Sequence, residues 1–235
     1  MPSMQRNDPR QYDDLAAEWW RPDGPFALLQ WLAAARAALI PPADAPGRVL
    51  IDAGCGGGLL APYVRDKGYQ HIGVDLGRAG LAQAAPHGMT PLNGDVTALP
   101  LASRSADVVV AGEILEHVTD LPATVAELCR VLRPGGLMVL DTVNDTRLAR
   151  LITVTLGERF GVVPAGLHDP ALFVSPDRLV TEFTRHGVNL TVRGVRPGLV
   201  GLFRWLVLRQ AVTGRIVPTF STAVLYQATG RRHAG

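Results

Sequence analysis

Residues 49–60, VLIDAGCGGGLL, decide the fold of this chain. An apolar run leads to Asp52, glycine then fills four of the five positions from 54 to 58, and apolar residues resume at Leu59. The pattern predicts a buried strand, a tight loop and the first turn of a helix. Because glycine has no Cβ and reaches positive φ, such a loop can present bare backbone N–H groups to a polar ligand.

The spacing in this loop excludes two common nucleotide-binding loops. A dinucleotide fingerprint that begins at Gly54 needs glycine where the chain has Leu59, and the Gly-Lys-Ser/Thr of a P-loop is absent. The arrangement of Asp52, Gly54, Gly56 and Gly58 instead resembles motif I of the class I S-adenosylmethionine (SAM)-dependent methyltransferases. The resemblance implies that SAM binds at this loop, with Cys55 as part of the site.

Length and composition are those of one globular α/β domain. The chain has 235 residues, 47% of them hydrophobic, and a formal net charge of +2. So small a charge does not favour nucleic acid as a partner. We expect a cytoplasmic protein, because no apolar run is long enough to span a bilayer and the N-terminus lacks the apolar core of a signal peptide. Cys55 and Cys129 make no metal-ligand spacing.

Strands and helices alternate from residue 49 onwards. Strands are expected from residue 49 and at residues 71–75, 89–92 and 107–111, with helices at residues 59–67 and 79–85 between them. A strand at residues 137–141 and closing strands at residues 188–195 and 222–228 complete the pattern. We therefore predict an α/β, Rossmann-like class I methyltransferase fold with a seven-stranded, mostly parallel sheet and helices on both faces.

Acidic residues follow two of the expected strands, at the sheet edge where such folds bind ligands. Asp75 lies about 20 residues after the glycine loop, where an acid accepts hydrogen bonds from ribose hydroxyls. Asp95 and Val96 fit an adenine clamp, and Leu76 completes the predicted cofactor site. For both acids the alternative is a solvated aspartate in a turn.

The segment after the fourth strand is the second candidate site. If residues 113–117 open a helix, Glu113, Glu116 and His117 share one face. Two carboxylates and an imidazole suit Mg²⁺ or another divalent cation, Zn²⁺ included. The alternative is packing beside the cofactor. If no metal binds, His117 is the first candidate for a general base and His168 the second.

The flanking segments are expected to surround this core. We predict an N-terminal helical lid at residues 1–45, the SAM-binding core at 46–145, and a substrate side with the closing strands at 146–235. Residues 1–11 are polar and are expected to be frayed. Trp19 and Trp20 either cap the core or cover a flat ligand. The apolar residues 199–209 either cover the core, line an apolar substrate cavity or lie on a membrane surface.

These motifs together resemble the ubiquinone-biosynthesis O-methyltransferases, which methylate catechol hydroxyls on polyprenylated rings. The resemblance runs over residues 12–176. It rests on the tryptophan pair, Asp23-Gly24, Arg36, the glycine loop, the Glu113–Glu116–His117 set and residues 163–169, VPAGLHD. It implies that Arg36, Gly54, Asp75 and the backbone near Gly112 contact SAM. It also implies a divalent cation at the Glu113–Glu116–His117 set and a membrane-associating segment at about residues 142–173.

Two departures from the family pattern concern the acceptor side. Residues 141–145, DTVND, stand where the family usually has S/T-T-x-N-R, and Arg196-Pro197 replaces a tyrosine–asparagine pair. Our hypothesis is metal-assisted, in-line methyl transfer to a phenol or catechol, with a polyprenylated quinol precursor as one such acceptor. The alternatives are a metal-independent methyltransferase of secondary metabolism and a non-catalytic SAM-binding scaffold.

Overall fold

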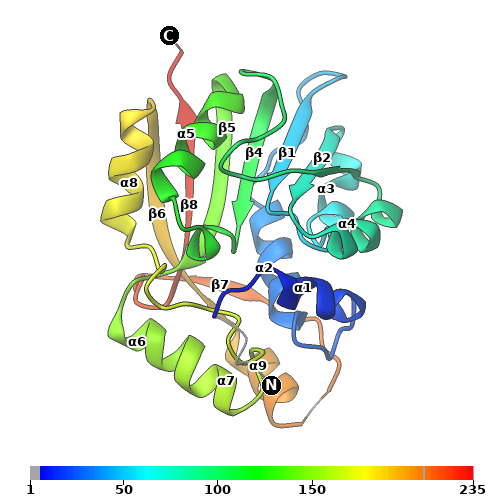
Figure 1. Cartoon of the computed structure of the whole chain (residues 1–235), viewed down its shortest axis with the longest axis vertical. Helices are drawn as coiled ribbons and strands as arrows, with labels where there is room; N and C mark the ends of the chain where they lie inside the picture. Colours follow the sequence, from blue (N-terminus) through cyan, green and yellow to red (C-terminus); the bar gives the residue numbers. More distant parts are fainter. Residues whose placement is uncertain (1–5, 209, 235) are drawn as a thin grey trace.

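The computed structural model describes residues 6–208 and 210–234 as a sheet with helices on both faces (Figure 1). The strands are β1 Val49–Ala53, β2 Gln70–Asp75, β3 Thr90–Asn93, β4 Ala106–Gly112, β5 Leu132–Val143, β6 Val188–Pro197, β7 Ile216–Thr219 and β8 Leu225–Arg232. The α-helices are α1 Arg10–Asp14, α2 Ala27–Ala37, α3 Ala61–Val64, α4 Arg78–Ala84, α5 Leu121–Val131, α6 Arg147–Ala149, α7 Gly157–Arg159, α8 Pro176–Arg185 and α9 Leu199–Leu206. The 3₁₀ turns are η1 Ala16–Glu18, η2 Arg65–Lys67, η3 Ala85–His87 and η4 Leu115–His117, and η5 Arg150–Leu156 is a π-helical turn between α6 and α7.

The strands of the described residues form one sheet in the order β3-β2-β1-β4-β5-β8-β6-β7. The first five in this order run parallel, and β8, β6 and β7 pair antiparallel. The predicted Rossmann-like fold is therefore confirmed, with one strand more than expected. The addition is β7, whose four residues pair with the end of β6. Such a short run, interrupted by Pro218, carries no strand pattern in the sequence.

Alternate residues of the central strands face opposite helical layers, as the pleat of a strand requires. Ile51 of β1 and Val109 of β4 belong to a buried cluster with α5 and α8. Their neighbours Leu50 and Val110 belong to a second buried cluster with α2 and α3. Both faces of the sheet are therefore covered, which explains why these strands are apolar without interruption.

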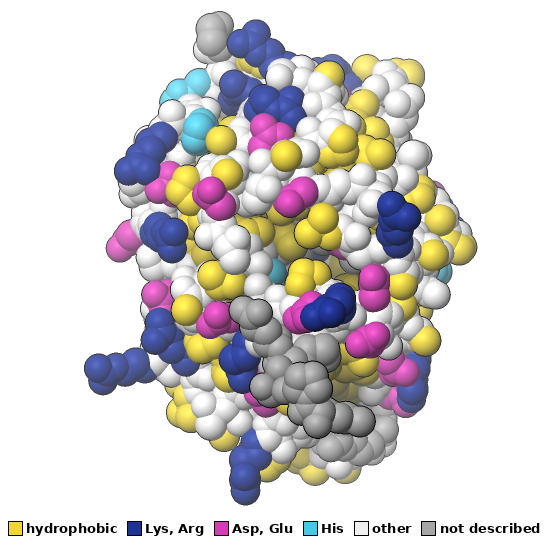
Figure 2. Space-filling view, in the orientation of Figure 1, with side chains coloured by type: hydrophobic (Ala, Val, Ile, Leu, Met, Phe, Trp, Pro, Cys, Tyr) yellow, Lys and Arg dark blue, Asp and Glu magenta, His cyan; other side chains and the backbone are white. Residues whose placement is uncertain are grey.

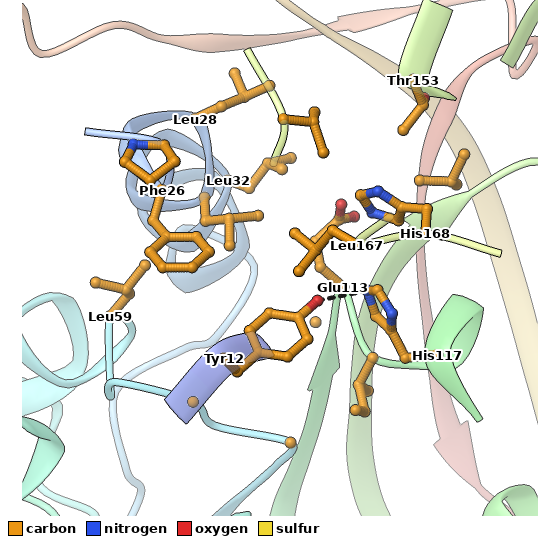
Figure 3. A pocket seen from close by; sticks show the side chains of 18 of the residues that line it. Tyr12, Phe26, Leu28, Leu32, Leu59, Glu113, His117, Thr153, Leu167 and His168 are labelled. Atoms are coloured by element: carbon orange, nitrogen blue, oxygen red, sulfur yellow. Dashed lines mark hydrogen bonds between the residues drawn. The ribbon is translucent and has the colours of Figure 1, made fainter. Parts of the chain in front are cut away.

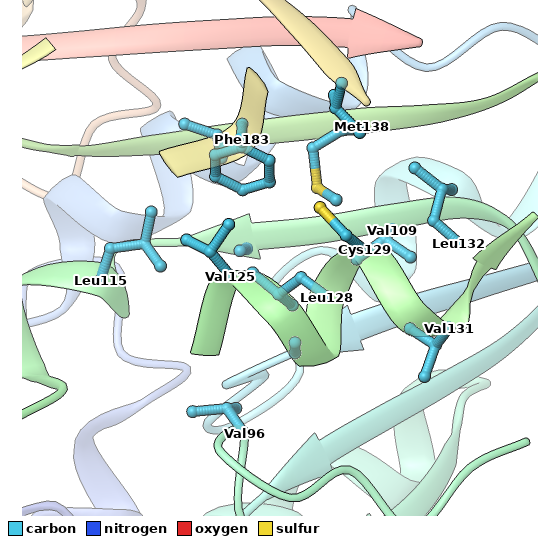
Figure 4. Packing of buried hydrophobic residues seen from close by; sticks show 14 of the residues in the cluster. Val96, Val109, Leu115, Val125, Leu128, Cys129, Val131, Leu132, Met138 and Phe183 are labelled. Carbon is cyan, nitrogen blue, oxygen red and sulfur yellow. The ribbon is translucent and has the colours of Figure 1, made fainter. Parts of the chain in front are cut away.

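The cluster under α5 and α8 also fixes the turn after β4. In Figure 4, Val125 of α5 and Phe183 of α8 pack together over the sheet, and Leu115 lies in the same cluster. Leu115 is fully buried. Because Leu115 opens η4, its burial anchors the turn that carries Glu116 and His117.

The carboxyl ends of the parallel strands meet at one edge of the sheet, and the flanking segments gather beyond it. In Figure 1, α1, α6, α7 and α9 lie together at this end of the molecule. Residues 147–159 form a continuous helical segment, α6–η5–α7. Among the described residues no helix combines the length and apolarity needed to cross a membrane. On the face that Figure 2 shows, lysine and arginine side chains are interspersed with aspartate and glutamate.

Candidate active site

The glycine loop connects β1 to α3 and is held by β2. The backbone N–H groups of Gly54 and Cys55 donate to the carbonyl of Val74 at 2.8 and 3.1 Å. Gly54 has φ of +73°, and a Cβ there would lie 2.4 Å from the side chain of Ile114. Glycine at position 54 therefore provides both the loop conformation and the close approach of the turn after β4.

Asp75 ends β2 and closes the loop from the other side. Its Oδ2 accepts from the Gly56 N–H at 2.8 Å, and its Oδ1 accepts from the Gly77 N–H at 2.8 Å. Burial raises the pKa of the Asp75 carboxyl, against the opposite effect of these two hydrogen bonds. Since each carboxylate oxygen has a second acceptor position, Asp75 can still receive the hydroxyls of a nucleoside.

Asp95 lies in the turn after β3, on the same side of the sheet. Its Oδ1 accepts from the backbone N–H and from the hydroxyl of Thr97, both at 2.8 Å. Asp95, Val96 and the exposed Leu76 line the same cavity as Asp75. The two acids predicted from the sequence are therefore brought together, with apolar side chains between which a flat ring can lie.

The remaining predicted cofactor residues, with one exception, line this cavity as well: Arg36, Asp52, Gly54, Cys55, Gly56 and Gly112. The exception is Gly58. A Cβ added to Gly58 would lie 2.7 Å from the Cβ of Ala84 and 2.9 Å from the sulfur of Met89. Glycine at this position therefore allows α4 to pack against the loop.

Arg36 of α2 forms a buried ion pair that the sequence did not reveal. Its Nε and Nη2 donate to the two carboxylate oxygens of Asp141 at 2.9 and 2.8 Å. Burial opposes the charge of Arg36, but Asp141 outweighs it, and the pKa of the guanidinium is raised. A Cβ on Gly112 would lie 1.8 Å from the guanidinium carbon, so only glycine fits beside it.

The turn after β4 differs from the helix that we expected. Only Leu115–His117 form a 3₁₀ turn, and Glu113 precedes it with a left-handed φ of +52°. Glu113, Glu116 and His117 therefore do not share a helix face. The carboxyl groups of Glu113 and Glu116 instead contact each other, and Glu116 Oε2 accepts from the Thr142 hydroxyl at 2.7 Å.

Burial governs the charge of this pair of glutamates. It raises the pKa of Glu113 well above its usual range, and the charge of Glu116 adds to the effect. Burial also raises the pKa of Glu116, whose bond from Thr142 acts in the opposite direction. Two carboxylates in contact therefore hold a proton between them unless a cation replaces it.

A possible ligand set joins this turn to the loop before α8. Ligand atoms of Glu116, His117 and His168 all lie within 4.8 Å of one another. The rings of His117 and His168 are 5.0 Å apart, centre to centre. Burial lowers the pKa of His117 well below its usual range and that of His168 to about 4. His168, which the sequence predicted only as a base, therefore belongs to the group of ligand atoms that lie close together. Glu113 is not in this group, but its carboxyl group contacts that of Glu116.

The N-terminal segment, residues 6–14, covers this histidine pair. The Tyr12 hydroxyl lies 3.0 Å from His117 Nε2, and Asn7 lies against the other ring nitrogen. Figure 3 marks the contact between Tyr12 and His117 with a dashed line. The expectation of a frayed N-terminus is therefore wrong for residues 6–11, while residues 1–5 lie outside the described part of the chain. A polar segment without periodicity gave no signal of these contacts, which depend on partners more than 100 residues away.

The tryptophan pair lies on the glycine loop. Trp19 is buried and stacks on Phe26 with ring centres 4.2 Å apart, and a Cβ on Gly56 would lie 2.4 Å from its ring. The Trp20 indole donates to the Gly57 carbonyl at 3.0 Å. These contacts favour the core-capping interpretation, although Trp19 also lines the cavity.

The cavity extends well beyond the predicted cofactor residues. It has a volume of about 1270 Å³. Beyond the histidine pair its walls are mainly apolar and come largely from α2, η5, the loop before α8 and α9. Figure 3 shows Phe26, Leu28 and Leu32 on one side of the cavity, with Thr153 and His168 on the other. One continuous cavity therefore connects the glycine loop, the glutamate–histidine cluster and an apolar chamber.

The fold, the glycine loop and the paired acids at the sheet edge define a class I SAM-dependent methyltransferase. A family model described as a methyltransferase domain matches residues 51–140. A SAM-dependent methyltransferase from Thermotoga maritima has the same fold, with a TM-score of 0.68 at 18% identity over 95% of this chain and 99% of that one.

Curated relatives narrow this class to one family. The chain is 31% identical over 219 residues to the ubiquinone biosynthesis O-methyltransferase of Leptothrix cholodnii, covering 86% of this chain and 93% of that protein. It is 32% identical over 232 residues to the protein of the same name from Ralstonia nicotianae, covering 94% and 92%. The chain belongs to the ubiquinone biosynthesis O-methyltransferase family, and it is a SAM-dependent O-methyltransferase.

Proposed function

We propose that this enzyme methylates a hydroxyl of a catechol-type ring that carries an apolar tail, with the help of a divalent cation. The observation that carries the proposal is the continuity of the cavity. The predicted cofactor residues other than Gly58, the side chains of Glu113, His117 and His168, and the apolar chamber line one space. A methyl donor, a polar ring and a tail would occupy these three parts in that order.

The size of the cavity supports two ligands at once. Pockets for a single drug-sized ligand usually measure about 300–1,000 Å³. The cavity of about 1270 Å³ exceeds that range. It therefore has room for SAM and for an acceptor with a substantial apolar part.

The residues at the glycine loop fit SAM by their chemistry. Asp75 can accept from two hydroxyls, and Asp141 uses only Nε and Nη2 of Arg36, so Nη1 is left for a carboxylate. Asp95 and Leu76 offer an acceptor and an apolar contact for a base. SAM supplies the electrophilic methyl group, and these residues bind and orient it. Orientation of two reactants can contribute about 7–11 kcal/mol in favourable cases.

The residues at the glutamate–histidine cluster fit a divalent cation. Three buried polar atoms there have no hydrogen-bond partner among the described residues: Glu113 Oε1, Glu116 Oε1 and His168 Nδ1. Carboxylate oxygens with imidazole nitrogens suit Mg²⁺, Mn²⁺ or Zn²⁺. We propose Glu113, Glu116 and His117 as ligands, with His168 within reach of the same ion. A bound divalent cation supplies Lewis acidity.

The two histidines can also move the proton of the acceptor. Their low pKa values keep both imidazoles neutral near pH 7, and both line the cavity. A neutral imidazole can accept the proton that an acceptor hydroxyl loses when the methyl group is transferred. Where no cation occupies His117, His117 is the first candidate for this role and His168 is the second.

The far end of the cavity supports a hydrophobic acceptor and a peripheral membrane contact. Five residues line the cavity and are also exposed: Ile152 and Leu156 of the α6–η5–α7 segment, Phe160 directly after it, and Leu199 and Val207 at α9. An exposed apolar rim that continues into a chamber would let a membrane-embedded acceptor enter directly. The apolar run at 199–208 thus serves the core, the cavity and the surface at once, while Arg209 lies outside the described residues.

The test is methyl transfer from labelled SAM to catechols with and without a prenyl tail, in Mg²⁺ and in EDTA. We expect turnover that depends on the cation and a lower KM for the tailed catechols. Glu116→Gln should abolish cation-dependent turnover while SAM still binds. Glu182→Gln, on the distant α8, is the matched control and should keep full activity.

Other outcomes would favour the alternatives. Full activity of wild type and of Glu116→Gln in EDTA would mean a metal-independent methyltransferase. SAM binding without turnover of any catechol would mean a scaffold. Co-sedimentation with phosphatidylcholine–phosphatidylglycerol vesicles tests the membrane contact. Val200→Glu with Phe203→Glu should weaken it, because both side chains are more than half exposed on α9.

A further inference from the structure

Both ring nitrogens of His117 contact the N-terminal segment, residues 6–14. Nδ1 lies 2.6 Å from Asn7 Oδ1, and Nε2 lies 3.0 Å from the Tyr12 hydroxyl. The proposed function uses His117 as a cation ligand or base but gives no role to Asn7 or Tyr12. Their contacts determine which nitrogen of His117 carries the proton.

The orientation of the Asn7 amide follows from a second hydrogen bond. Asn7 Nδ2 donates to the backbone carbonyl of His117 at 2.8 Å. A carbonyl can only accept, so the amide nitrogen must face it and the amide oxygen must face the ring. The amide oxygen also can only accept, so the hydrogen of this contact belongs to Nδ1.

The tautomer of a neutral His117 is thereby fixed. A neutral imidazole carries one N–H, so Nε2 holds a lone pair, and the Tyr12 hydroxyl must donate to it. A metal ion or an acceptor hydroxyl needs the same lone pair. Tyr12 and such a ligand therefore cannot use Nε2 at the same time.

The N-terminal segment is built to hold this arrangement. Asn7 adopts a left-handed φ of +60°, which asparagine tolerates better than most residues. Its backbone N–H donates to the Gly166 carbonyl at 2.9 Å, and Arg6 Nε donates to the His168 carbonyl at 2.8 Å. The segment thus binds both His117 and the loop that carries His168.

We propose that Asn7 and Tyr12 are positioning residues for His117. Asn7 holds the ring in the tautomer with hydrogen on Nδ1, and Tyr12 covers Nε2 until a cation or an acceptor replaces its hydroxyl. This inference rests on the proposed role of His117 in the acceptor site. An outer partner that fixes the tautomer of a ligating histidine is a general feature of metal sites.

The direct test is long-range ¹H–¹⁵N NMR on protein labelled with ¹⁵N-histidine, without SAM or metal, and with His117→Gln to assign the signal. In wild type we expect Nδ1 as the protonated nitrogen of His117. Asn7→Ala should shift the ring to the other tautomer or to a mixture, and Asn7→Asp, which keeps an acceptor, should retain hydrogen on Nδ1. Asn189→Ala, at an exposed site on β6, should change nothing. Tyr12→Phe should keep the tautomer and move only the Nε2 shift.

A second measurement follows Nε2 itself. In a Co²⁺ titration without SAM, Tyr12→Phe should bind roughly two- to tenfold more tightly than wild type, since one competing hydrogen bond is removed. Asn7→Ala should bind more weakly. Hydrogen on Nε2 in wild type, a doubly protonated ring, or an unchanged tautomer in Asn7→Ala would overturn the role of Asn7. Weaker or unchanged Co²⁺ binding by Tyr12→Phe would overturn the role of Tyr12. If wild type binds no Co²⁺, the cation part of the proposed function fails. The NMR result alone then decides whether Asn7 and Tyr12 position His117.

Discussion

The ion pair between Arg36 and Asp141 gives the sharpest prediction for stability. The side chains are 8% and 0% exposed, and two hydrogen bonds of 2.9 and 2.8 Å join them. Asp141→Leu would leave a buried guanidinium without its carboxylate. Breaking a buried pair in this way costs about 3–5 kcal/mol. For a chain of this size that loss corresponds to a decrease in Tm of roughly 6–20 °C.

The measurement is equilibrium urea unfolding of four proteins: wild type, Asp141→Leu, Arg36→Met and the double variant. The double variant removes both charges, so it should lose much less free energy of unfolding than the two single variants together. We expect a coupling energy of about 2 kcal/mol. Glu182→Leu, whose partner Arg185 is 63% exposed, is the control and should cost less than about 1 kcal/mol.

Two results would refute this reasoning. A loss below about 1 kcal/mol for Asp141→Leu would mean that water or another group satisfies Arg36. Simple additivity in the double variant would mean that the two side chains do not depend on each other.

Three further predictions follow from the same region. Gly112→Ala should cost about 1–3 kcal/mol and weaken SAM binding measured by calorimetry, because the new Cβ would lie 1.8 Å from the Arg36 guanidinium carbon. Asp120→Ala should cost about 1 kcal/mol in urea unfolding, because the Asp120 side chain accepts from the Ala123 N–H at 2.9 Å and caps α5. In EDTA, the free energy of unfolding of wild type should fall as pH rises above about 4.5, because the pKa of Glu113 is raised in the folded protein and folding therefore favours its protonated form. Glu113→Gln should show a shallower fall in the same pH series.

Local patterns explain what the sequence could predict. The glycine loop, Asp75 and the parallel strands depend on spacing within about 30 residues, where apolar periodicity and turn residues are informative. The topology then follows, because parallel strands bring their carboxyl ends to one edge. The predicted cofactor residues, other than Gly58, line one cavity for this reason.

The acceptor side could not be predicted in the same way. Asn7 and Tyr12 meet His117 across 110 and 105 positions, and Arg36 meets Asp141 across 105. The periodicity of apolar residues along the sequence does not indicate contacts between residues so far apart. The helix expected at residues 113–117 failed for another reason: Glu113 takes a left-handed φ of +52°, which side-chain spacing does not reveal and which is common where function constrains the backbone.

Asp141 connects the departure from the family pattern to the proposed cation. The family usually has Ser or Thr at this position, and there the charge of Arg36 would be free to offset the glutamates. In this chain Asp141 engages Arg36 through both carboxylate oxygens, so the pair is neutral as a whole. If Glu113 and Glu116 both lose their protons, they place two negative charges in a buried site, and the proposed divalent cation would balance them. Asp141 should therefore strengthen the requirement for a cation, and Asp141→Ser should lower cation affinity.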